Sequence, residues 1–188
     1  MSIKINYFKN LSNNKTANLV LFSNEKFNTN NLKKFITSSE LSYVNDLLKT
    51  SDLKKNLFVY DLSSKRKIIL ISIKDNLKTS DIENLGAEFF GRINNGKNSE
   101  YFIVSDSINT KNENFLGHFL HGLKLKSYEF NKYKTKKKIR SIVLNLSGNK
   151  NKPSSKAQLK FRALEEGTFY ARDLVSEPGN ILHPDEYA

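Results

Sequence analysis

The 188-residue chain contains no cysteine. Disulfide bonds, thiolate metal sites and a cysteine nucleophile are therefore excluded. The chain also lacks any apolar run near the roughly 20 residues that a membrane-spanning helix needs. Its first residues, MSIKINYFKN, hold no apolar stretch of the length typical of a signal peptide. We therefore expect a cytoplasmic protein with no membrane contact.

Several patterns that carry chemistry are missing as well. The sequence has no G-x-G-x-x-G, no G-x-S-x-G and no H-E-x-x-H. Residues 86–91 and 117–122 both have G-x-x-x-x-G spacing, but neither is followed by Lys-Ser or Lys-Thr, and both lie inside helical patterns. A phosphate loop needs free backbone N–H groups at the start of a helix, so we expect neither segment to bind phosphate.

Acidic residues are outnumbered by basic ones, 19 against 31, and the net charge is +12. A basic chain attracts polyanions, which makes nucleic acid a partner to consider. The excess of Lys is accompanied by many Asn, Ile and Phe residues, all of which have A- and T-rich codons. Base composition alone therefore explains the basicity without a dedicated partner.

Apolar patterns predict strands in several places. Alternation over residues 3–8 is typical of a half-buried strand, and the continuous runs at 19–22, 101–104 and 139–146 indicate strands buried on both faces. Residues 57–62 and 67–73 are two apolar runs joined by the polar turn 63–66, which predicts a hairpin. The mixed stretch 28–55 favours one or two short helices.

Two longer helices are indicated between these strands. Ser80 is predicted to cap the first, which ends at 94–96, and its Gly86 and Gly91 are expected to allow close packing against a neighbour. The second has an apolar face from Phe115 to Leu123. Alternating strands and helices predict an α/β fold with a mixed or parallel sheet flanked by helices.

The clearest linker is Ser147–Ser155, which divides the chain into domains 1–150 and 151–188. A long helix follows it and ends at Pro178, with Glu165 and Glu166 expected on its wetter side. Its residues Leu159, Leu164, Leu174 and Val175 are expected to leave an apolar stripe in water. Pro184, Asp185 and Glu186 read as the start of a further helix, so we expect the chain to be truncated within another domain.

The histidines offer a weak metal hypothesis. His118 and His121 lie three residues apart on a predicted helix, but a zinc site needs further ligands, and the nearest acid, Glu113, precedes both. We favour two polar residues at a helix end. His183 is interpreted as a variable position, not as a general base.

The best polyanion patch is the segment 128–140, in which basic residues alternate with Tyr128, Phe130 and Tyr133. Its basic members are Lys132, Lys134, Lys136, Lys137, Lys138 and Arg140. Such interleaving suits single-stranded nucleic acid, because bases stack and phosphates pair. We favour a solvated loop before a strand, with the aromatic rings anchored in the core.

The acids nearest the C-terminal end are Asp173, Glu177, Asp185 and Glu186. Asp173 is expected to pair with the adjacent Arg172 or to act as a cap. Glu177 with Pro178 is expected to close the helix, and Asn180 to turn the chain through its side-chain amide. None is predicted to bind a metal.

Two segments carry a family resemblance. Residues 171–184, ARDLVSEPGNILHP, resemble the ARDLVNEP-x-N-x-L-x-P signature of the leucine aminopeptidase (cytosol aminopeptidase) family, with Ser176 where the family usually has Asn. Residues 121–138, HGLKLKSYEFNKYKTKKK, resemble the family's EGLLLGSYRFDKYKTKKK. The segments stand in the family's order and at about its spacing.

The resemblance implies a macro-domain-like N-terminal α/β domain, followed by a long interdomain helix and a larger catalytic domain. That catalytic domain holds two divalent metals, manganese or zinc, forms a homohexamer, and releases N-terminal amino acids from peptides. The family's metal and catalytic motifs, VGKGVTFDSGG and NTDAEGR, do not occur in this sequence. No catalytic, cofactor-binding or metal residue is therefore assigned, and the chain alone is expected to be inactive and to bind no metal.

Two alternatives stay open. Some bacterial members of the family use their N-terminal domains on DNA, which would assign weak DNA binding to the basic residues 132–140. Analogy with macro domains suggests a nucleotide or ADP-ribose site, although the expected glycine-rich loop is absent.

Overall fold

The computed structural model describes residues 2–9, 18–94, 99–135 and 141–179. Within these residues the strands form one sheet in the order β1-β6-β5-β2-β4-β3. The strands are β1 (Ser2–Phe8), β2 (Asn18–Asn24), β3 (Leu57–Ser63), β4 (Arg66–Ile73), β5 (Ser99–Val104) and β6 (Ser141–Ser147). All neighbours are parallel except β3 and β4, which form the antiparallel hairpin. The predicted mixed sheet is confirmed.

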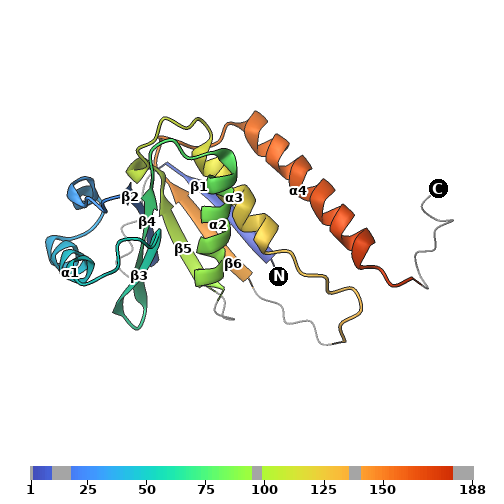
Figure 1. Cartoon of the computed structure of the whole chain (residues 1–188), viewed down its shortest axis with the longest axis horizontal. Helices are drawn as coiled ribbons and strands as arrows, with labels where there is room; N and C mark the ends of the chain where they lie inside the picture. Colours follow the sequence, from blue (N-terminus) through green and yellow to red (C-terminus); the bar gives the residue numbers. More distant parts are fainter. Residues whose placement is uncertain (1, 10–17, 95–98, 136–140, 180–188) are drawn as a thin grey trace.

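Helices cover both faces of this sheet, which explains the continuous apolar runs in its central strands. On one face, α2 (Thr79–Ile93) and α3 (Phe115–Lys126) pack on β2, β4, β5 and β6. On the other, α1 (Ser38–Lys49) and the 3-10 turn η1 (Asn30–Lys34) cover β2, β4 and β5. The long helix α4 (Ser155–Ser176) lies beside α3, at the end of the molecule opposite α1 (Figure 1). Among the described residues, no helix is both long and apolar enough to span a bilayer.

The start of α2 differs from the prediction. The helix begins at Thr79, and Ser80 lies within its first turn instead of capping it. The backbone N–H of Lys78, just before the helix, donates a hydrogen bond to the Asp81 carboxylate at 3.0 Å. An acid in the first turn also suits the positive end of the helix dipole. The helix ends at Ile93 with Asn94 as its cap residue, which agrees with the start of the end predicted at 94–96.

Hydrogen bonds attach the predicted linker to the α/β domain. Ser147 belongs to β6, and Asp106 in the turn η2 (Ser105–Ser107) accepts hydrogen bonds from the backbone N–H groups of Asn149 at 2.9 Å and Lys150 at 2.8 Å. The side-chain amide of Asn151 donates to the carbonyl groups of Ser105 and Ile108. The entry into α4 is therefore held by hydrogen bonds and is not a free tether.

A close crossing fixes α2 against α3. A Cβ added at Gly86 would lie 1.9 Å from the carbonyl oxygen of Phe119, and one at Gly122 would lie 1.9 Å from the carbonyl oxygen of Glu83. The expected close packing is confirmed for Gly86. It is wrong for Gly91, where an added Cβ would meet no atom within 4 Å.

This contrast gives a matched pair of substitutions. We expect Gly122→Ala to lower the free energy of unfolding by at least about 2 kcal/mol, because backbone atoms would have to separate. Gly91→Ala, in the same helical setting but in open space, should raise it by up to about 1 kcal/mol through better helix propensity. Urea unfolding monitored by circular dichroism measures both. Equal effects of the two substitutions would contradict the assigned crossing.

Candidate functional site

The packing of α4 on α3 centres on one aromatic ring. Phe161 of α4 lies over Gly117 of α3, where an added Cβ would come within 2.4 Å of the ring. The rings of His118 and His121 flank it, with centroids 4.8 and 5.5 Å away. Because Gly117 has no side chain, the two helices approach closely at this point. Gly117 is thus a contact point between two helices, a role that the sequence pattern did not indicate.

A buried carboxylate forms the second part of this interface. Glu165 of α4 is only 6% exposed, and it accepts a hydrogen bond from Lys124 Nζ at 2.7 Å. His121 Nδ1 lies 3.6 Å from the other oxygen of the same carboxylate. The expectation that Glu165 faces water is therefore wrong. A buried acid is retained here because a lysine on the facing helix balances its charge.

The two histidines do not share a ligand site. His118 Nδ1 lies 3.3 Å from Glu83 of α2, whereas His121 faces Glu165 of α4. Each ring is thus directed to a different carboxylate on a different helix. Over residues 2–9, 18–94, 99–135 and 141–179, no group of three or more His, Cys, Asp or Glu side chains is arranged to hold a metal ion.

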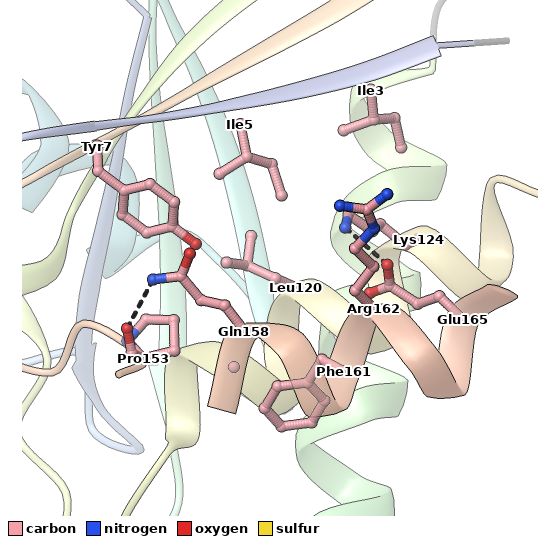
Figure 2. Close-up of a pocket in the computed structure, with 11 residues that line it drawn as sticks. Ile3, Ile5, Tyr7, Leu120, Lys124, Pro153, Gln158, Phe161, Arg162 and Glu165 are labelled. Atoms are coloured by element: carbon pink, nitrogen blue, oxygen red, sulfur yellow. Dashed lines mark hydrogen bonds and ion pairs between the residues drawn. The ribbon is translucent and has the colours of Figure 1, made fainter. Parts of the chain in front are cut away.

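A groove of about 270 Å³ opens between β1, α3 and α4 (Figure 2). Its apolar walls come from Ile3, Ile5, Leu120 and Phe161. Several of its polar groups are engaged within the protein: Gln158 donates to the Pro153 carbonyl, Lys124 pairs with Glu165, and Arg162 pairs with Glu166. Burial, together with the nearby charge of Glu165, raises the pKa of Tyr7 on the rim.

The basic and aromatic segment contacts α4 instead of standing free in solvent. The Tyr128 hydroxyl donates to Asp173 at 2.8 Å, and Lys132 Nζ donates to Glu177 at 2.5 Å. The Tyr133 hydroxyl donates to the other oxygen of Glu177. Tyr133 is 50% exposed, so its expected anchoring in the core is wrong. Lys136, Lys137, Lys138 and Arg140 lie outside the described residues.

The acids of α4 behave differently from the sequence expectation. Asp173 accepts from Tyr128, while Arg172 donates to the Leu125 carbonyl at 2.7 Å, so the expected pairing of these neighbours is not what engages them. Glu177 does close the helix, as predicted, through its backbone N–H to the Leu174 carbonyl. No sequence pattern indicates the hydrogen bonds that Glu177 accepts from Lys132 and Tyr133. The remaining C-terminal candidates, Asn180, His183, Asp185 and Glu186, lie outside the described residues.

The outward face of α4 is apolar and exposed, as expected. Leu159 is 68% exposed, Leu164 47% and Val175 83%, while Leu174 is partly covered. Tyr170, 67% exposed, extends the same surface. Large apolar side chains gathered on one exposed helix are typical of a surface that meets another protein body.

Comparison with solved structures defines the class of fold. The chain superposes over its whole length on a mutant of tomato leucine aminopeptidase, covering 41% of that chain, with a TM-score of 0.69 and 15% identity. Cytosol aminopeptidase from Coxiella burnetii gives a TM-score of 0.58 over 96% of this chain and 35% of that one, at 13% identity. The α/β domain and its long helix thus have the fold found in aminopeptidases of this kind.

Sequence comparison identifies the family. Residues 19–137 match the model of the cytosol aminopeptidase family, N-terminal domain, and the chain belongs to this family. It is 29% identical over 117 residues to a probable cytosol aminopeptidase of Nitrobacter winogradskyi, which covers 60% of this chain and 23% of that protein. A probable cytosol aminopeptidase of Clostridium perfringens is 36% identical over 99 residues, 49% of this chain and 20% of its own. The chain spans about a quarter of the length of these curated relatives, and none of these matches supports the DNA-binding alternative.

The buried carboxylate can be tested against its exposed neighbour. We expect Glu165→Gln to lower the free energy of unfolding by about 1–3 kcal/mol, because Lys124 would lose its charge partner in a largely buried position. Glu166→Gln is the matched control, since its pair with Arg162 is exposed and should contribute little to stability. Chemical denaturation of the three proteins measures the difference. A control as destabilised as Glu165→Gln would refute the buried pair.

The end of α4 carries a pH-dependent contact. The hydrogen bond from Lys132, with a second from Tyr133, lowers the pKa of Glu177 below its ordinary value of 4.5. A lowered folded-state pKa means that the contact stabilises the fold above about pH 4.5, and that this contribution is lost as the pH falls through the lowered value. In an NMR titration, Lys132→Met should return the Glu177 pKa toward 4.5, whereas Lys134→Met should leave it unchanged. A Glu177 that titrates identically in all three proteins would exclude the contact.

Proposed function

We propose that this chain is the non-catalytic N-terminal part of a metal-dependent leucyl aminopeptidase, a protein that releases N-terminal amino acids from peptides by hydrolysis. The observation that carries the proposal is the family match over residues 19–137, which concerns the N-terminal domain itself. Residues 1–150 would form the α/β domain, and 151–188 the connecting helix with the first residues of the catalytic domain. The long helix that follows β6 supports this division.

The two-metal centre of such an enzyme does not fit the residues described here. Each histidine of α3 faces its own carboxylate, and the described ranges hold no cluster of three potential ligands. Manganese or zinc would instead be bound by the part of the polypeptide that corresponds to the other three-quarters of the relatives. In this proposal, the residues described here supply no nucleophile, base or metal ligand to the reaction.

The N-terminal domain would contribute to the enzyme by holding the catalytic domain through α4. The inner face of this helix is used by α3, whereas Leu159, Leu164 and Val175 leave an exposed apolar surface. A catalytic domain that follows α4 in the same polypeptide is the natural occupant of that surface. Peptide substrates, assembly as a homohexamer and a cytoplasmic location belong to the same proposal, supported by the family match.

Activity measurements test the proposal directly. The complete reading frame that contains this chain should release leucine from leucine amide when supplied with manganese or zinc, and a chelator should abolish the release. The 188-residue chain should release none above the rate without protein, with or without metal. A complete protein with no aminopeptidase activity under any metal would overturn the assignment, and so would metal-dependent release by the chain alone.

A further inference from the structure

The distal part of α4 runs beyond the side chains of α3 that hold its first half. Glu165 pairs with Lys124, close to the end of α3 at Lys126. The helix continues to Ser176, and eleven residues at 1.5 Å each add about 16 Å. In this distal part, α3 is contacted through the hydrogen bond that Arg172 donates to the Leu125 carbonyl at 2.7 Å. Further contacts are needed if the distal part is to keep one direction.

The segment that follows α3 supplies the missing support. Residues 127–133, here named the strap, run under the distal part of α4. The ring of Tyr128 lies 5.4 Å from that of Phe169, and the Arg172 guanidinium lies 5.5 Å from the Tyr128 ring centroid. The same tyrosine donates to Asp173. One strap residue thus contacts three positions spread over a full turn of α4.

A second group of contacts holds the last turn. Lys132 and Tyr133 each donate to a different oxygen of Glu177, whose side chain is only 8% exposed as a result. Phe130 packs against Tyr133, with ring centroids 5.8 Å apart. Both ends of the strap are therefore attached to α4, at Tyr128 and at the Lys132–Tyr133 pair.

The charges of α4 are arranged for the strap and not for the helix itself. The C-terminal end of a helix is the negative end of its dipole, so acids there are unfavourable and cations favourable. In α4 the pattern is reversed: Asp173 and Glu177 lie at this end, and the last turn has no basic residue. The compensating cation is Lys132, which the strap provides. Helix stability alone therefore does not account for Glu177, whereas binding to the strap does.

We propose that residues 127–133 form a strap that locks the distal part of α4, so that the chain leaves the domain in one fixed direction. The lock unites two segments that are about 45 residues apart and that each carry one of the family-like motifs. It deepens the proposed function, because a catalytic domain joined to α4 would inherit its orientation from this contact. The lock itself belongs to this chain and does not depend on any enzymatic activity.

Hydrogen exchange measured by mass spectrometry on the 188-residue chain tests the lock. In the wild-type protein, amides of residues 169–176 should be protected. Glu177→Gln should speed their exchange by roughly 3- to 10-fold, because local opening of the last turns becomes easier. Tyr128→Phe, which keeps the ring and removes only the hydroxyl, should have a similar but smaller effect. Neither should change exchange in the sheet or in residues 157–165.

Two further variants make the outcome decisive. Glu166→Gln removes an exposed acid of the same helix that does not contact the strap, and it should leave exchange at 169–176 unchanged. Exchanging the two charges, Lys132→Glu with Glu177→Lys, should restore most of the protection that Glu177→Gln removes. Unprotected distal amides in the wild type would overturn the proposal, as would equal effects of Glu166→Gln and Glu177→Gln or a charge swap without recovery. Because no catalysis is measured, failure of the aminopeptidase assignment would not affect this result.

Discussion

The arrangement of this domain depends on α3 being enclosed on nearly every side. Its residues Phe115, Leu116, Phe119, Leu120 and Leu123 face the sheet and α2, and they are at most 5% exposed. Two glycines then let backbones approach from different directions: Gly122 admits α2, and Gly117 admits the Phe161 ring of α4. The five-residue spacing that superficially resembles a phosphate loop is thus the spacing of two helix contacts. Gly117 in particular lets α4 pack closely on the domain.

Much of the fold follows from apolar periodicity. Strands such as β2 and β4 are buried on both faces, so their sequences are continuous apolar runs that identify them without further context. The same logic fails at positions where a partner distant in sequence decides the environment. Gly91 and Gly86 look alike in the sequence, yet only Gly86 meets a neighbouring backbone. Ser80 is a reasonable cap in isolation, but the helix begins before it, at Thr79, with Lys78 as the cap residue.

The interface between α3 and α4 shows the same limit of sequence-based prediction more sharply. Glu165 and Glu166 are adjacent acids with equal helix propensity, and nothing local separates the buried one from the exposed one. What separates them is Lys124, 41 residues away, which reaches Glu165 and not Glu166. The apolar stripe of Leu159, Leu164 and Val175 is exposed, as expected, but no local pattern indicates which other face of α4 packs on the domain. The structure buries the face that bears Phe161 and Glu165, because that face matches the glycine, histidine and lysine side of α3.

The distribution of charge also acquires a specific meaning. Some of the basic residues that suggested a polyanion partner form contacts within the molecule. Lys124 pairs with Glu165, Lys132 pairs with Glu177, and Arg172 lies over the Tyr128 ring. All three contacts join α4 to α3 or to the strap. Around the Phe161 ring, the inner side of α4 is therefore held by charge pairs and hydrogen bonds, which have directional requirements, while its outer side offers apolar side chains, which have none. A helix held in a defined direction on one side and left adaptable on the other has the properties needed at a joint between two folded bodies.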